Sequence, residues 1–227
     1  MAAGNGKKFI QWNREYPEYR SFRSKKFLED LETAKLLYLG QYNQTSTAVI
    51  SAYSKHIKAF LARGGVLFID YSNNLPDFTD FFETIGVKNP VPEYKDYKTN
   101  SKNEYYKAEP NPKCKLSLLN RPWKLDKIRA YGWWNVWSDK QIIPFQNSAH
   151  PEKSAAMIIQ ENVMGKGKVI FNSISGIFRS SLDGGNTKYL KNTLSYIFEK
   201  NIKEYLKQQM EERGGPGEVA DLREVSK

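Results

Sequence analysis

The segment spanning residues 56–74 constrains the fold of this chain more than any other. Apolar residues at helical spacing end at the pair Gly64 and Gly65, and an apolar run, 66–69, follows at once. Glycine adopts the left-handed backbone conformation that closes a helix, because it has no Cβ. An amphipathic helix that passes directly into a short buried strand is typical of a parallel α/β sheet. We therefore predict an α/β fold with Val66–Asp70 as an inner strand.

Helices and strands alternate along much of the rest of the chain. The predicted elements in chain order are helix 25–33, strand 35–40, a helix from about 45 to 63, strand 66–70, helix 76–85, strands 155–160 and 168–173, and a last helix from 187 to 210. A glycine-rich turn, 164–167, predicts that the two late strands form an antiparallel hairpin. Residues 88–112 are interpreted as an irregular surface excursion, and 113–150 show little regular pattern. The repeats favour a mainly parallel sheet with right-handed crossovers.

Composition divides the chain into three parts. Residues 1–24 are polar with interspersed aromatics, and Pro17 interrupts their helical spacing, so we predict an arm that docks its aromatic side chains onto the main domain. Residues 25–207 form the predicted α/β domain. Residues 208–227 are polar and contain glycines and a proline at 214–217, which predicts a disordered tail.

Cysteine and histidine are scarce in this chain. The single cysteine, Cys114, allows no internal disulfide, and His56 and His150 supply no ligand cluster, so we expect neither a metal nor a cofactor. No apolar run approaches the roughly 20 residues that span a bilayer. The first eight residues lack the apolar stretch of a secretory signal, but a mature domain would lack it too, so the compartment stays open.

The formal net charge of +10 bears on the kind of partner. A basic chain favours anionic partners such as nucleic acid or another polyanion. The simpler interpretation is a solvated lysine-rich surface, because the lysines are scattered and no block of five basic residues occurs. A polyanion therefore remains an alternative partner.

Four segments carry a resemblance to a known family. They are residues 38–41 (Tyr-Leu-Gly-Gln), 57–70, 165–173 and 189–194. In this order and spacing they resemble the non-catalytic branch of the class I glutamine amidotransferase-like superfamily, including ThuA-like domains, over roughly residues 26–200. The resemblance implies a flavodoxin-like three-layer sandwich, with a mainly parallel sheet and a late antiparallel hairpin. It implies a fold rather than an activity, because one fold hosts many functions.

Catalytic members of that superfamily carry a cysteine at the elbow after the strand, activated by a later histidine and glutamate. Here the elbow, residues 70–73, reads Asp-Tyr-Ser-Asn, and Cys114 lies in the irregular region, where we interpret it as an ordinary free thiol. His150 begins a His-Pro-Glu tripeptide that precedes the hairpin, which we interpret as a turn. ThuA-like domains often have a histidine after the last strand, where residues 173–176 read Ser-Ile-Ser-Gly. We therefore expect a pseudoenzyme without catalytic residues.

Polar side chains follow the strands 35–40 and 66–70. Ligands of open parallel sheets bind beyond the carboxyl ends of the strands, and amide groups both donate and accept hydrogen bonds, as sugar hydroxyls require. The predicted ligand-binding residues of this rim are Gln41, Tyr71, Ser72 and Asn73, with Asn43 and Asn74 beside them. The competing interpretation is that these side chains satisfy loop backbone groups. Ser72 has no histidine nearby, so we interpret it as a loop hydroxyl rather than a nucleophile.

Residues 131–137 contain three tryptophans. Exposed indoles form flat platforms for sugar rings or bases, so Trp133 and Trp134 are candidate ligand-binding residues. The alternatives are that they fill the core or form a protein–protein contact.

Three functions remain open at this point. The first is a non-enzymatic amidotransferase-like module that binds a small ligand, such as a carbohydrate, or a protein partner. The second is a carbohydrate- or acyl-directed hydrolase that uses Asp70 or His150 with the polar rim. The third is a nucleic-acid or polyanion binder.

Overall fold

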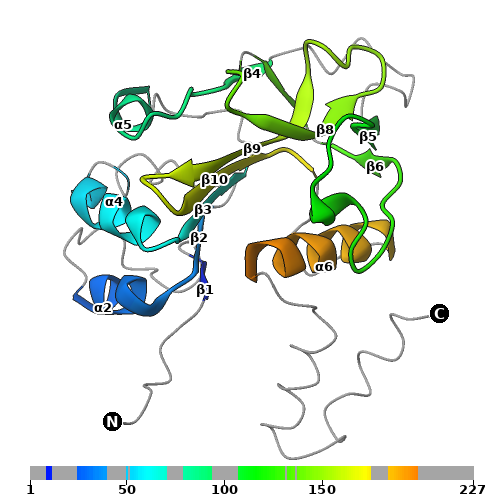
Figure 1. Ribbon diagram of the computed structural model, residues 1–227. Coiled ribbons are helices and arrows are strands. Elements are labelled where there is room, and N and C mark those ends of the chain that lie inside the picture. Colours follow the sequence, from blue (N-terminus) through cyan, green and yellow to red (C-terminus); the bar gives the residue numbers. More distant parts are fainter. Residues whose placement is uncertain are drawn as a thin grey trace, which may run out of the picture.

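The computed structural model describes residues 9–11, 25–39, 50, 52–70, 79–93, 107–130, 132–135, 137–174 and 184–198. The described residues form an α/β fold around one mixed sheet of ten strands (Figure 1). None of the helices within these ranges is long and apolar enough to cross a membrane.

Four consecutive strands of the sheet are parallel. Their order is β1 (Phe9–Gln11), β2 (Leu36–Leu39), β3 (Val66–Asp70) and β10 (Gly167–Asn172). Each of β2, β3 and β10 is apolar over most of its length, as expected for strands covered on both faces. The short β1 belongs to the segment predicted as a docking arm, so part of that arm is instead a strand of the sheet, hydrogen-bonded to β2.

Helices cover both faces of the parallel strands (Figure 1). On one face lie α2 (Lys25–Thr33), α4 (Ser54–Ala62) and α5 (Thr79–Thr84), whose apolar residues join the odd-numbered residues of β2, β3 and β10 in one core. On the other face, α6 (Gly184–Phe198) packs on a second core with the even-numbered residues of β2 and β3 and with Ile170 of β10. The parallel strands thus lie between helices on both faces.

The remaining strands are antiparallel and more numerous than one hairpin. The predicted hairpin is confirmed as β9 (Ala155–Val163) with β10. The sheet then continues through three further strands and a two-strand branch. These are β8 (Ile142–Asn147), β5 (Lys107–Pro110) and β6 (Ile128–Arg129), and the branch of β4 (Val91–Glu93) with β7 (Trp133–Asn135), in which β7 also pairs with β9. The interpretation of 88–112 and 113–150 as largely irregular was therefore wrong for these strands.

The junction between α4 and β3 has the geometry that the glycine pair predicts. Gly64 has φ of +93°, its N–H donates to the Leu61 carbonyl at 2.8 Å, and the Gly65 N–H donates to the Phe60 carbonyl at 2.9 Å. These two bonds form a Schellman motif, which satisfies the last carbonyls of a helix. A Cβ on Gly65 would lie 2.5 Å from the Phe60 ring, so Gly65 is required for space, whereas Gly64 is required for its conformation.

Several predicted boundaries lie outside the described residues. The predicted start of the helix before β3 falls in 41–49, and α4 as described begins at Ser54. The predicted end of the last helix, near 210, lies outside as well, and α6 is described to Phe198. Neither the remainder of 1–24 nor the segment 208–227 is described.

Candidate functional site

A chain of hydrogen bonds runs across the sheet edge at which β2, β3 and β10 end. The Tyr38 hydroxyl donates to Oδ2 of Asp70 at 2.5 Å, and Nδ2 of Asn172 donates to Oδ1 of Asp70 at 2.6 Å. The Tyr189 hydroxyl of α6 donates to Oδ1 of Asn172, also at 2.6 Å. We name these four residues, Tyr38, Asp70, Asn172 and Tyr189, the edge network.

The strand period places three members of the edge network together. In the parallel register Tyr38 aligns with Phe68, and Asp70 aligns with Asn172. Because side chains alternate between the two faces of a strand, even-numbered residues of β2, β3 and β10 point to the face that α6 covers. On this face β3 therefore ends on Asp70 and β10 ends on Asn172. α6 supplies Tyr189 above them.

The edge network is mostly buried. Asn172 and Tyr189 are fully buried, Tyr38 is nearly so, and Asp70 is the partly exposed member of the four. Nδ2 of Asn172 also donates to the Ile174 carbonyl, and Oδ1 of Asn172 accepts the Ile174 N–H. Burial raises the pKa of the Tyr189 phenol well above its ordinary value, and the nearby charge of Asp70 raises that pKa further, so Tyr189 remains a neutral donor. The network thus presents one oriented carboxylate at the sheet edge.

The predicted rim residues follow directly after these strands. Gln41 comes two residues after β2 ends at Leu39, and Tyr71, Ser72 and Asn73 follow Asp70 at the end of β3. All four lie outside the described residues. Ligand binding by the rim therefore stays a prediction.

The adjacent indoles of Trp133 and Trp134 are interior. Each is 1% exposed, and they lie in different cores, because neighbouring residues of β7 point to opposite faces. The Trp134 ring packs edge-on against Phe171 with ring centroids 5.6 Å apart. Neither ring presents a face as an open platform, so core packing is the interpretation that this geometry favours for both.

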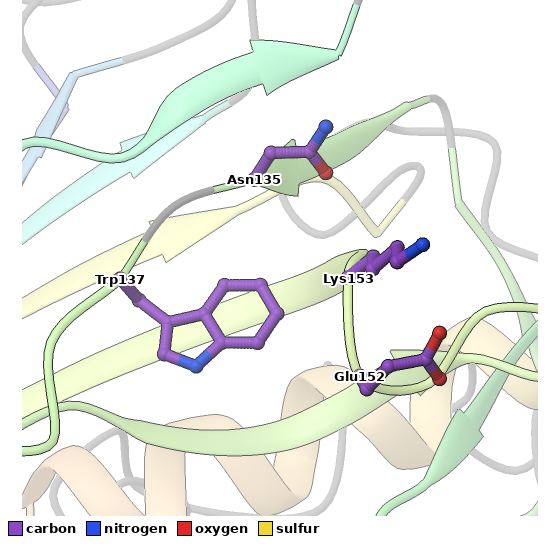
Figure 2. Close-up of a pocket in the computed structure, with 4 residues that line it drawn as sticks. All are labelled: Asn135, Trp137, Glu152 and Lys153. Carbon is purple, nitrogen blue, oxygen red and sulfur yellow. The ribbon is translucent and has the colours of Figure 1, made fainter.

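A pocket of about 440 Å³ lies beside these tryptophans, and its described lining residues are Asn135, Trp137, Glu152 and Lys153. Figure 2 shows the Trp137 indole on one side of the pocket, with Lys153 and Glu152 across from it and Asn135 on the strand above. Trp137 is half-buried and packs partly on the core, whereas Glu152 and Lys153 are exposed. The volume falls in the range of about 300–1,000 Å³ that small-molecule sites occupy.

This pocket lies at the same sheet edge as Asp70. Asn172 pairs with Met157, and Gln146 pairs with Ala155, so β8 ends and β9 begins where β3 and β10 end. Glu152 and Lys153 are in the turn between β8 and β9, which places them beyond this edge. Neither residue was predicted from the sequence to bind a ligand. The sequence feature that could have indicated them is a charged pair in a tight turn that follows three tryptophans.

The predicted turn at His150 is confirmed, since its carbonyl accepts the N–H groups of Lys153 and Ser154. Cys114 is half-buried at the edge of the sheet opposite Asp70. Burial raises the pKa of its thiol, and the negative charge of Glu161 adds to this increase. Within the described ranges, no three His, Cys, Asp or Glu side chains gather as metal ligands.

Comparison with known proteins yields a distant structural similarity and no match in sequence. No protein-family model matches the chain, and no curated protein matches it. Among solved structures, the chain is similar to a crystal structure from Bacteroides uniformis described as a ThuA-like protein, with a TM-score of 0.47 and 12% identity over 77% of this chain and 73% of the other.

Proposed function

We propose that this chain is a non-enzymatic, amidotransferase-like module that binds a neutral, hydroxyl-rich ligand of the carbohydrate class beyond the carboxyl edge of its parallel strands. The finer family assignment, to the ThuA-like branch with a flavodoxin-like sandwich, belongs to the same proposal. It is supported by the alternation of helices and strands and by helices on both faces of the sheet. A protein partner at this edge is the other occupant that the proposal admits.

The observation that carries the proposal is the composition of the pocket. Trp137 supplies an apolar ring, and Asn135 supplies an amide that both donates and accepts hydrogen bonds. Glu152 accepts and Lys153 donates, and their charges cancel, so the described lining has no preference for an anion or a cation. A sugar ring has an apolar face and a rim of hydroxyls that donate and accept. These properties match the pocket.

A calorimetric and NMR titration with neutral mono- and disaccharides, including glucose and maltose, tests the proposal. We expect saturable binding that Glu152→Gln weakens by about tenfold, because a hydrogen bond to a charged group is worth roughly 1.5–3 kcal/mol. Trp137→Ala removes the ring and abolishes binding, although its partial burial also affects stability. The matched control is Glu109→Gln, a carboxylate on β5 outside the pocket lining, which leaves binding unchanged. Absence of binding by every saccharide contradicts the proposal.

The non-enzymatic part of the proposal has a separate test. Wild-type protein is incubated with glutamine, an aryl ester and aryl glycosides, and the release of product is followed. We expect no turnover above background. Turnover that Ser72→Ala abolishes would replace the proposal with a serine-dependent enzyme.

A hydrolase remains the second candidate because of how Asp70 is held. The side chains of Tyr38 and Asn172 orient its carboxylate, which stays partly exposed at the edge. Glycoside hydrolysis commonly uses two carboxyl groups, and Glu152 is the one carboxylate among the described residues that line the pocket. Turnover of an aryl glycoside that Asp70→Asn abolishes, in a protein that remains folded, would favour this second candidate.

A further inference from the structure

The positive charge of this protein is concentrated in two segments that pack together. Residues 107–130 hold seven lysines and arginines against two acids, and α6 holds Lys188 and Lys191 with no acid. These segments therefore supply seven of the ten net positive charges of the chain. The scatter of lysines along the sequence does not reveal this, because α6 lies more than 50 residues beyond the first segment.

Buried hydrogen bonds hold the two segments against each other. The Asn192 side chain is fully buried, and its Nδ2 donates to the carbonyls of Leu118 at 2.8 Å and Trp123 at 2.6 Å. Its Oδ1 accepts the Trp123 N–H at 3.2 Å. The backbone of Trp123 is thus fixed on α6. This attachment sets the position of the loop that carries Arg121 and Lys124.

One basic side chain contacts the Trp123 indole, and three more flank it in the sequence or lie on the neighbouring α6. The Lys191 ammonium lies 5.1 Å from the centre of the ring, and Trp123 and Lys191 are both half-exposed. Arg121 and Lys124 flank the indole in sequence and are exposed, and Lys188 lies one helical turn before Lys191 on α6, also exposed. We name these five residues, Arg121, Trp123, Lys124, Lys188 and Lys191, the basic face.

The two acids of this region oppose its charge only in part. Oε2 of Glu109 lies 3.7 Å from Nζ of Lys127, so the two side chains form an ion pair. Asp126 is exposed, and its Oδ1 accepts the backbone N–H of Lys127. Four cationic side chains and one aromatic ring therefore remain grouped on the basic face.

We propose that the basic face binds single-stranded nucleic acid. Phosphates supply the anions that four cations attract, and an indole supplies a surface on which an unpaired base stacks. The combination favours a single strand over a duplex, whose bases are stacked on each other, and over a sulfated glycan, which has no base. The basic face lies on the α6 side of the sheet and is separate from the pocket at Trp137.

The test measures the binding of a fluorescein-labelled oligothymidylate of about twenty nucleotides to the full chain by fluorescence anisotropy. The expected slope of log K against log[KCl] is about −3, since single strands give roughly −0.7 for each of four phosphate contacts. The double variant Arg121→Gln, Lys124→Gln reduces the magnitude of this slope by about 1.4. The matched control, Lys55→Gln with Lys58→Gln on α4, removes the same charge from the opposite side of the sheet and leaves the slope unchanged.

Two further variants separate stacking from charge. Trp123→Ala weakens binding by roughly 5- to 160-fold without changing the slope, because stacking on an aromatic ring is not salt-dependent in the way phosphate contacts are. Lys191→Gln lowers both affinity and slope, and it tests the face independently if Trp123→Ala does not fold, which circular dichroism reports.

Three outcomes overturn the proposal. One is no binding of the oligothymidylate at about 50 mM KCl. Another is that a duplex of the same length, or heparin, binds as tightly as the single strand and that Trp123→Ala does not change this affinity. The third is that the control variant on α4 loses as much affinity as the variant on the basic face.

Discussion

The Tyr38 hydroxyl donates a hydrogen bond of 2.5 Å to Oδ2 of Asp70, which joins β2 to β3 at their carboxyl ends. Asn172 of β10 binds the other oxygen of the same carboxylate. One side chain therefore ties three adjacent parallel strands together. The contact lies at the carboxyl edge of the parallel strands, beyond which ligands of such sheets bind.

This arrangement predicts energetic coupling between Tyr38 and Tyr189. Tyr38→Phe and Tyr189→Phe each remove one donor, and each is expected to lower the free energy of unfolding by about 1–2 kcal/mol. The double variant departs from the sum of the two by at least about 0.5 kcal/mol, because both hydroxyls act on the Asp70–Asn172 pair. Urea unfolding measures the cycle. Tyr196→Phe is the control, since its hydroxyl binds Glu161 instead, and its effect adds to that of Tyr38→Phe.

The end of α4 predicts different costs for its two glycines. Gly64→Ala places a Cβ at a φ of +93° and is expected to cost about 1 kcal/mol or more. Gly65→Ala forces a Cβ against the buried Phe60 ring, which is expected to cost about 1–3 kcal/mol. Gly165→Asn is the control, because that site also has positive φ but open space around it, and asparagine tolerates this conformation. Equal stability of all three variants and the wild type would contradict the Schellman geometry.

Glu161 predicts a loss of stability in acid. Burial raises the pKa of this carboxyl, but hydrogen bonds from Tyr196 and Lys168 and the charge of Lys168 outweigh burial, so the net pKa is below its ordinary value. A carboxyl with a lowered pKa in the folded state stabilises the fold above its unfolded pKa. This stability is lost as the pH falls below about 4.3 and through the folded pKa. Thermal unfolding of Glu161→Gln between about pH 7 and pH 3 should show a smaller acid loss than wild type. An equal loss would contradict the ion pair.

Cys114 is predicted to be an unreactive thiol. Burial raises its pKa, the backbone of Leu116 lowers it, and the negative charge of Glu161 raises it, with a net increase. Since the thiolate is the reactive form, alkylation by iodoacetamide should be slower than for an exposed cysteine, with a midpoint above the ordinary value of about 8.5. Mass spectrometry of the modified protein across a pH series measures this midpoint. A midpoint below the ordinary value would point to an activated thiol.

The parallel part of the fold was predictable because its signals are local. The helix, Gly64, Gly65 and β3 follow one another within 17 residues, and each has a distinct composition. The edge network also left a trace, since the apolar runs of β3 and β10 each end on a polar residue, Asp70 and Asn172. What the sequence did not reveal is that α6 returns to place Tyr189 on Asn172, because that contact depends on tertiary packing.

The antiparallel strands other than β9 were missed for a physical reason. β5 and β6 have four and two residues, are rich in charge, and pair at Lys107 with Arg129 across a separation of 22 positions. Such strands have too few residues to show a period of two, and their pairing is non-local. The pocket could not be predicted for the same reason. Trp137 and Glu152 line it together only because the turn between β8 and β9 brings Glu152 back towards Trp137.

The direct test of ligand binding at the carboxyl edge uses ¹⁹F NMR of protein labelled with 5-fluorotryptophan. The chain has five tryptophans, and Trp137→Phe assigns the resonance of the pocket indole. On titration with the saccharide panel, we predict a saturable shift of the Trp137 resonance, while the resonances of the buried Trp133 and Trp134 stay unchanged. Saturable shifts at Trp133 or Trp134 with none at Trp137, or no shift with any saccharide, would contradict it.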